Sequence, residues 1–184
     1  MKTALILIDF QNDYFPAGKM ELESPLEAAA QACKLLDFFR RQKWPTVHIQ
    51  HISNRPGATF FLPDTDGAKF HVSILPLPGE TVIVKHFPNS FRETTLLEHL
   101  QELHIERLVL CGMMTHMCVD ASMRAAADFG FPVLLAADAC ATRALSYGET
   151  KIPAAHVHGA FLAALKSYGQ VLASSEIPVQ LKEG

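Results

Sequence analysis

The sequence lacks the features that would place it outside the ordinary globular class. No apolar run in its 184 residues approaches the ~20 residues that a membrane-spanning helix needs. The net charge of −3 leaves no basic surplus for nucleic acid or for an anionic membrane. No internal repeat or low-complexity segment is visible. We therefore predict no nucleic-acid partner and no membrane partner.

Cysteines are also scarce, and their spacing suggests no pairing. The four, Cys33, Cys111, Cys118 and Cys140, form no C-x-x-C motif. This pattern favours a reduced, cytoplasmic protein. The apolar start of the chain is interrupted at Asp9, and no small-x-small cleavage site follows, so we interpret it as a mature strand and not as a signal peptide.

Short apolar runs alternate with helical periodicity along the chain, which is 49% hydrophobic and 19% charged. This alternation predicts one domain, residues 1–184, with a Rossmann-like three-layer αβα sandwich and a six-stranded, mainly parallel sheet. Ser24 before Pro25 predicts a capped helix start, with Glu27 completing a capping box. We expect a polar tail after residue 173. The expected strands are 4–8, 46–50, 81–84, 108–111, 133–136 and 171–173, and the expected helices are 24–43, 94–103, 117–129 and 148–168.

The stretch from Leu108 to Asp120 joins a strand to a cysteine. Its apolar run is broken at Gly112, and helical spacing resumes at Met117. Cys118 therefore falls near the first turn of a helix, where free N–H groups and the helix dipole favour a thiolate and suit an oxyanion. The alternative is a small apolar residue on the buried side of a helix, where most cysteines lie.

Two other predicted buried strands end at charged residues. Asp9 follows the run 4–8, and Lys85 follows the run 81–84. Because open parallel sheets bind ligands at the carboxyl ends of their strands, a carboxylate, an amine and the Cys118 thiol are expected to share one cleft. The alternatives are a helix or loop cap for Asp9 and a solvated charge at the sheet edge for Lys85.

Taken together, these segments resemble the isochorismatase-like cysteine hydrolases, a superfamily that contains nicotinamidases and several ureide and carbamoyl amidohydrolases. The resemblance covers nearly the whole chain in the right order. The matching segments are D-F-Q-N-D at 9–13, the lysine segment at 85–94, G-x-x-T-x-x-C-V at 112–119 and A-D-A at 137–139.

The resemblance implies a mechanism. Cys118 attacks a carbonyl carbon and forms a thioester, Asp9 carries the proton, and Lys85 orients Asp9. The backbone N–H groups of Met114 and Cys118 are implied as the oxyanion hole, with a cis peptide bond between Met113 and Met114. Judged from the residues alone, these two methionines would be interpreted as core filling.

The resemblance does not extend to the metal site of nicotinamidases. Those proteins carry Asp-x-His after the second strand, whereas residues 47–53 here read V-H-I-Q-H-I-S. His48, His51 and His71 remain, but a metal site needs several ligands at workable geometry. We predict no metal and no cofactor.

The substrate pocket is expected among loops after the strands. Arg55 and Arg143 could hold a carboxylate, and the irregular, proline-rich segment 54–79 is the length expected of a functional loop or lid. An aromatic residue in such loops anchors the loop as often as it lines a pocket. The candidates are Phe15, His51, Phe60, Phe61, Phe87, Phe91 and Thr115.

We predict a hydrolase that cleaves the C–N bond of a small amide, ureide or carbamoyl substrate through a thioester. One alternative is an isochorismatase-type vinyl ether hydrolase, although the members known for that reaction lack the cysteine. The other is a non-catalytic oligomeric member of the fold. The resemblance also implies a homodimer or homotetramer, with segments 60–70 and 160–165 as candidate interfaces.

Overall fold

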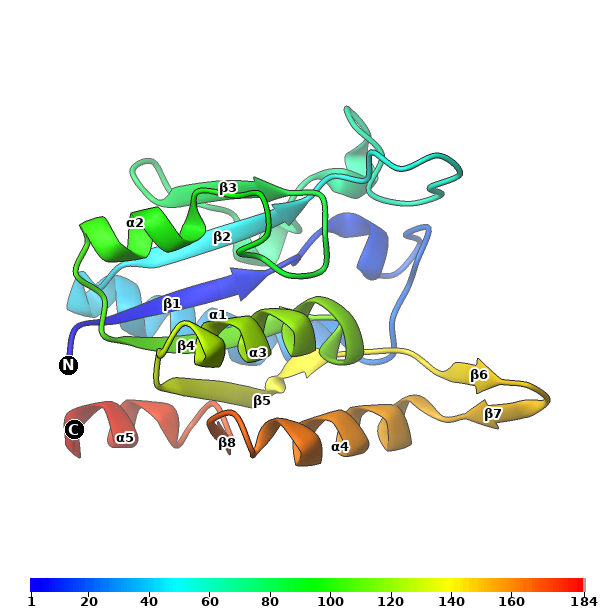
Figure 1. The fold of residues 1–184 in the computed structure, drawn as a ribbon. Helices are drawn as coiled ribbons and strands as arrows, with labels where there is room; N and C mark the ends of the chain where they lie inside the picture. The colour runs from blue at the N-terminus through cyan, green and yellow to red at the C-terminus, as the bar shows by residue number, and fades with distance from the viewer. Residues whose placement is uncertain (184) are drawn as a thin grey trace.

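A computed structural model, which describes residues 1–183, shows one central six-stranded sheet (Figure 1). All neighbouring strands are parallel, in the order β3-β2-β1-β4-β5-β8. The predicted six-stranded parallel sheet is confirmed. Its strands are β1 (Thr3–Ile8), β2 (Thr46–His51), β3 (Thr81–Lys85), β4 (Arg107–Met113), β5 (Val133–Ala141) and β8 (Gln170–Leu172).

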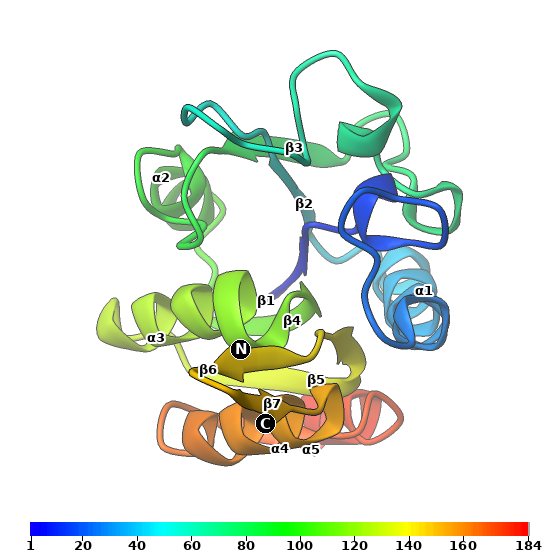
Figure 2. The same cartoon turned by 90° about the vertical axis from the view of Figure 1, so that its right-hand side faces the viewer.

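Helices cover both faces of this sheet, which gives the expected three layers (Figure 2). One buried cluster joins one face of the sheet to α1 and α5, and a second joins the other face to α2, α3 and α4. The helices are α1 (Pro25–Gln42), α2 (Leu96–Glu102), α3 (Asp120–Asp128), α4 (Ala154–Leu165) and α5 (Ile177–Glu183).

Strands β1 and β4 form the centre of the sheet and are buried on both faces, which explains why they read as unbroken apolar runs. Leu5 and Leu7 pack toward α1, while Ile6 and Ile8 pack toward α2 and α3. At the end of β4, a Cβ on Gly112 would collide with the carbonyl oxygen of Ile8. The glycine is thus required where β1 and β4 approach one another.

Two local predictions are wrong. Strand β3 is not buried on both faces, because it forms the sheet edge and leaves Val82 and Val84 42% and 44% exposed. Ser24 does not cap α1 with its side chain, because its backbone is left-handed, with φ of 54°, and no side-chain cap hydrogen bond forms.

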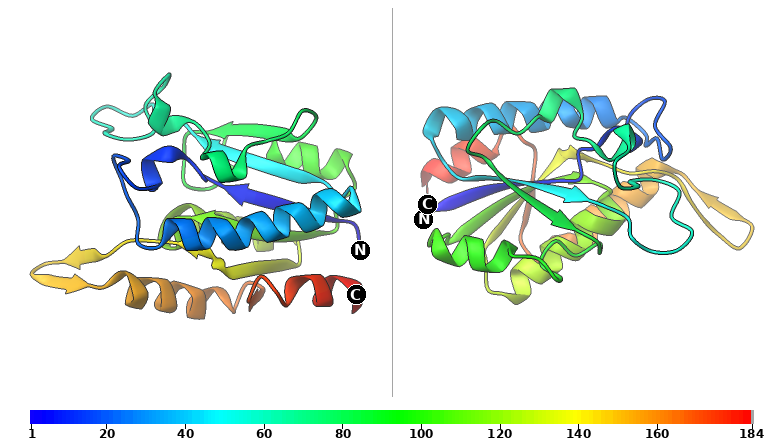
Figure 3. Two further views of the ribbon diagram at one scale, coloured as in Figure 1. Left: turned by 180° about the vertical axis from the view of Figure 1, so that it is seen from behind. Right: turned by 90° about the horizontal axis from the view of Figure 1, so that it is seen from above.

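The C-terminal third differs most from prediction. The expected helix 148–168 is a hairpin followed by a shorter helix, because Gly148 takes a left-handed turn and Pro153 delays the start of α4. The hairpin, β6 (Leu145–Tyr147) and β7 (Thr150–Ile152), projects from the body of the molecule (Figure 3). The expected polar tail forms α5, whose Ile177 and Leu181 are buried against the α1 side of the core.

The long segment between β2 and β3 is irregular, as predicted, with two short 3₁₀ turns, Asp66–Ala68 and Val72–Ile74. A third, Asn12–Tyr14, follows β1. No helix among residues 1–183 combines the length and apolar character needed to cross a membrane.

Candidate active site

Three strand ends bring Asp9, Lys85 and Cys118 together at the carboxyl edge of the sheet. Asp9 follows β1, Lys85 ends β3, and Cys118 lies five residues after β4. Lys85 Nζ donates to Asp9 Oδ2 at 2.8 Å, and both side chains are fully buried. Cys118 Sγ lies within 4.8 Å of an Asp9 carboxylate oxygen. The structure thus shows the predicted convergence of the three side chains, of which Cys118 lines a cavity while Asp9 and Lys85 are buried beside it.

The ammonium of Lys85 uses all three of its donors. Besides Asp9 Oδ2, it lies 2.9 Å from His51 Nδ1 and donates to the carbonyl oxygen of Phe87 at 3.2 Å. Burial is the largest single influence and lowers the pKa of Lys85, but the charge and hydrogen bond of Asp9, together with the neighbouring Cys118, outweigh it, so the pKa is raised overall. Lys85 is therefore a fixed cation that holds one oxygen of Asp9.

Cys118 is a buried thiol at rest, which corrects the expectation of a thiolate. It lies in a π-helical turn, Thr115–Val119, with 4% of its surface exposed. Burial, followed by the charge of Asp9, raises the pKa of Cys118 to about 12, and the opposing effect of Lys85 is smaller. Because the thiol does not ionise by itself, it needs a base at the moment of attack. Asp9 Oδ1 has no hydrogen-bond partner among residues 1–183, so it is available to accept the proton of the thiol.

The nucleophile turn is closely tied to its surroundings. The bond between Met113 and Met114 is cis, as the resemblance implied. Backbone N–H groups of Met117 and Val119 donate to the carbonyl oxygen of Met114 at 3.0 and 3.2 Å. Thr115 Oγ1 donates to the carbonyl oxygen of Ala141. Of the two predicted oxyanion donors, the N–H group of Cys118 lies within the turn Thr115–Val119 and that of Met114 directly precedes it.

A cavity of about 210 Å³ opens directly above Cys118. At ~30 Å³ per water it holds about seven water molecules, so it suits a small substrate. The segment between β2 and β3 supplies much of its wall, as expected of a functional loop. The lining residues are Tyr14, His51, Ser53, Asn54, Arg55, Phe60, His86, Phe87, Pro88, Met114, Met117 and Cys118.

Of the predicted pocket residues, His51, Phe60 and Phe87 line this cavity. The others lie behind the wall, because their side chains anchor loops to the core. Phe61 is fully buried against Tyr14, at 4.6 Å between ring centroids, and Phe91 packs on Phe129 at 5.2 Å.

Phe15 and Thr115 are likewise outside the cavity lining. Phe15 stacks on His71 at 3.7 Å between centroids. Thr115 is fully buried and its Oγ1 lies 2.9 Å from His158 Nδ1, so it ties the first residue of the turn Thr115–Val119 to α4.

Three buried residues after β1 went unrecognised in the sequence. Gln11 Nε2 donates to the carbonyl oxygens of His51 and Ala68, and its Oε1 accepts from the N–H of His51. Asp13 accepts from the N–H of Phe61 at 2.7 Å. These side chains clamp the cavity loop to β1. Polar residues repeated through the D-F-Q-N-D run were the available signal.

Tyr14 is the third residue, and it lines the cavity. Burial and the neighbouring Cys118 and Asp9 raise its pKa well above the usual value, so it stays a neutral phenol. From the sequence, the neighbouring Phe15 is the pocket candidate, but Tyr14 is the residue of the two whose side chain lines the cavity.

Among residues 1–183, one group of potential metal ligands is close enough to share an ion: Asp9, His51 and Cys118. Lys85 already donates to Asp9 Oδ2 and approaches His51 Nδ1. A divalent cation would meet that ammonium at contact distance, which disfavours a resident metal here.

The other two histidines considered for a metal have different partners. His48 is a buried strand residue whose Nε2 lies 2.9 Å from Glu80 Oε2. His71 Nδ1 lies 2.8 Å from Ser73 Oγ. Neither lines the cavity above the cysteine.

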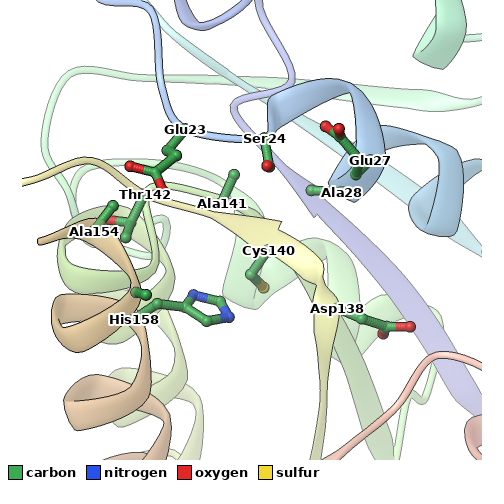
Figure 4. A pocket seen from close by; sticks show the side chains of 11 residues that line it. Glu23, Ser24, Glu27, Ala28, Asp138, Cys140, Ala141, Thr142, Ala154 and His158 are labelled. Atoms are coloured by element: carbon green, nitrogen blue, oxygen red, sulfur yellow. The ribbon is translucent and has the colours of Figure 1, made fainter.

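A second cavity, of about 190 Å³, lies beside β5 and the starts of α1 and α4 (Figure 4). Glu23, Glu27 and Asp138 contribute carboxylates to its lining. Asp138 accepts from the N–H and the Oγ of Ser174, so its oxygens serve the fold. His158, which contacts the nucleophile turn, also lines this cavity.

The fold and site agree with the comparisons to known proteins. The isochorismatase domain model matches residues 3–175, so the chain belongs to the isochorismatase family. The uncharacterized isochorismatase family protein YddQ of Bacillus subtilis is 49% identical over 176 residues, which cover 96% of this chain and 98% of YddQ.

Two further relatives are a solved structure and a curated enzyme. A crystal structure described as an isochorismatase hydrolase, from Oleispira antarctica, superposes with a TM-score of 0.92 at 47% identity, covering 96% of this chain and 95% of its own. The maleamate amidohydrolase of Pseudomonas putida is 25% identical over 148 residues, covering 73% of this chain and 70% of its own. The chain is an isochorismatase-family hydrolase, and the family resemblance seen in the sequence is confirmed.

Proposed function

We propose that this protein is a cysteine hydrolase that cleaves the C–N bond of a small amide, ureide or carbamoyl compound through a thioester. The observation that carries the proposal is the contact of Lys85 with Asp9 beside the thiol of Cys118, which lines a small cavity. A relative whose name is maleamate amidohydrolase supports the reaction class.

The reaction begins when the Cys118 thiol gives its proton to the free oxygen of Asp9, and the sulfur bonds to the substrate carbonyl carbon. The carbonyl oxygen becomes an oxyanion, which the N–H groups of Met114 and Cys118 would stabilise. The intermediate then expels the nitrogen, which takes the proton from Asp9 and leaves as ammonia or an amine. Lys85 keeps Asp9 in position throughout.

Deacylation reuses the same groups. Asp9 removes a proton from water, whose oxygen attacks the thioester carbon. The sulfur leaves and takes the proton back from Asp9, which restores the thiol and releases a carboxylic acid. No step requires a metal or another cofactor.

We also propose that the protein works in the cytoplasm as a homodimer or homotetramer. Its four cysteines are free, which fits a reducing compartment. On α4, Ala160, Ala163 and Ala164 are exposed, so this face is a candidate for the interface, while Leu165 is buried within the subunit.

The test is a screen of small amides and ureides for ammonia release, with Cys118→Ala as the matched control. We expect release by the wild-type protein, none by the variant, and no change in rate on adding a chelator. An intact protein that releases no ammonia from any compound would favour a vinyl ether hydrolase or a non-catalytic role.

A further inference from the structure

His51 lines the cavity and contacts Lys85, the residue that positions Asp9, and these contacts fix the position of its ring proton. Its Nδ1 is 2.9 Å from Lys85 Nζ. An ammonium can only donate, so Nδ1 accepts and carries no proton. Burial, and then the charge of Lys85, lower the pKa of His51 to about 4. The ring is therefore neutral at pH 7, with its single proton on Nε2.

The Nε2–H group is a donor without a protein acceptor. Among residues 1–183 the structure shows no hydrogen bond at His51 Nε2, although the ring lines the cavity and its side chain is only 15% exposed. The ring is also held in place. Gln11 binds the backbone N–H and carbonyl of His51, and Phe61 packs beside the ring at 5.8 Å between centroids.

The rest of the lining favours an acceptor-rich ligand. No Asp or Glu within the described residues lines the cavity, and Asp9 beneath it is neutralised by Lys85. Arg55 contributes a cation to the wall. A ring nitrogen of His51 lies within 4.8 Å of Cys118 Sγ, so the ring lies beside the nucleophile in the same cavity.

We infer that His51 determines specificity by donating its Nε2–H to a second acceptor of the substrate, such as the carbonyl or carboxylate at the far end of a diamide or an amide-bearing acid. The inference rests on the proposed amidase function and adds the substrate class to it. A plain alkyl amide would leave this half-buried donor unpaired, and a site that loses such a hydrogen bond discriminates against the ligand.

Three probes of similar length isolate the effect. Butyramide ends in a methyl group, succinamide in a carboxamide and succinamate in a carboxylate. We expect kcat/KM for each of the latter two to exceed that for butyramide by at least about tenfold, the worth of one well-placed hydrogen bond. A larger preference for succinamate than for succinamide would also support the inference, because a hydrogen bond to a charged acceptor is stronger than one to a neutral acceptor.

Two substitutions separate the two nitrogens of the ring. In His51→Asn the carboxamide oxygen can take the place of Nδ1 and accept from Lys85, but nothing replaces the Nε2 donor. The preference over butyramide should fall to about one. In His51→Gln the carboxamide nitrogen reaches toward the Nε2 position, so the preference should persist while kcat falls for all three probes. His156→Asn, at an exposed histidine of α4, is the matched control and should keep the wild-type preference.

If His51→Asn keeps the full preference for succinamide and succinamate over butyramide, the inference is overturned. An equal loss of kcat/KM on all three probes would overturn it too, because His51 would then donate to the reacting carbonyl that all three share. Wild-type protein that hydrolyses another amide but neither succinamide nor succinamate would also contradict it, with the proposed function intact. If no amide at all is hydrolysed, the proposed function fails and the inference fails with it.

Discussion

In the resting protein Cys118 should behave as a buried thiol, not as an activated thiolate. Its pKa is raised to about 12, from an ordinary value of 9.0, by burial and by the charge of Asp9. At pH 7 the thiolate fraction is then about 10⁻⁵, against about 10⁻² for an ordinary thiol, so alkylation should be ~1,000-fold slower at equal access. The rate should rise about tenfold for each pH unit between 7 and 10, with no plateau.

Replacing Asp9 should separate reactivity from catalysis. Asp9→Asn removes the negative charge that raises the Cys118 pKa and leaves the Lys85 ammonium in place, so that pKa should fall. Alkylation at pH 7 should then accelerate by at least about tenfold. Turnover should nevertheless be lost, because an amide can neither take nor return the proton.

The assay is timed labelling with iodoacetamide, followed by mass spectrometry of the peptide that carries Cys118. Cys118→Ala measures the background from the three other cysteines. A wild-type rate that levels off near neutral pH would reveal a resting thiolate and refute the reasoning. Slower labelling in Asp9→Asn would refute the assigned effect of the carboxylate.

Three predictions concern stability and are measured by urea unfolding. Lys85→Met leaves the buried Asp9 carboxylate unpaired and should cost ~3–5 kcal/mol, part of which Asp9→Asn in the same chain should restore; full wild-type stability would contradict the buried ion pair. Burial raises the pKa of Glu80, but hydrogen bonds, of which that from the Arg40 guanidinium is the strongest, outweigh it and hold the pKa at about 2, below the ordinary value of 4.5. The Glu80 carboxylate therefore contributes ~3 kcal/mol of stability above pH 4.5, and this contribution is lost as the pH falls toward 2. Glu80→Gln should be destabilising at pH 7 and nearly neutral at pH 2, and an equal effect at both pH values would contradict the lowered pKa. Gly112→Ala should cost at least ~2 kcal/mol, because φ is +145° and the new Cβ meets the Ile8 carbonyl oxygen, and an unchanged midpoint would show that β1 and β4 can separate.

The sheet and the three strand-end residues could be predicted because both follow from local patterns. Buried parallel strands read as apolar runs, and a charge directly after such a run marks the ligand-binding edge. The burial of β3 was mispredicted, because Thr81–Val84 is equally apolar whether a strand lies at the edge or the centre. Only the order of strands, a tertiary fact, leaves Val82 and Val84 exposed.

The remaining errors come from chemistry that spacing does not encode. The helix-start argument for a thiolate at Cys118 considered the dipole but not desolvation, and desolvation is the larger influence. Gly148 and Pro153 were signals of a turn and of a late helix start, but the many apolar residues of the segment favoured an uninterrupted helix. The cavity wall comes from a loop whose path is set by Gln11 and Asp13, and contacts across 40 or more residues are invisible to periodicity.

The central claim is that Cys118 carries the acyl group during turnover, and a rapidly quenched reaction tests it most directly. With an amide identified in the ammonia screen, mass spectrometry should find the peptide that contains Cys118 carrying the acyl group of the substrate. Its mass should increase by that of the acyl group less the one hydrogen lost from the thiol. In Cys118→Ala both the adduct and ammonia release should be absent. Full ammonia release by Cys118→Ala would contradict the account and leave direct attack by water as the mechanism.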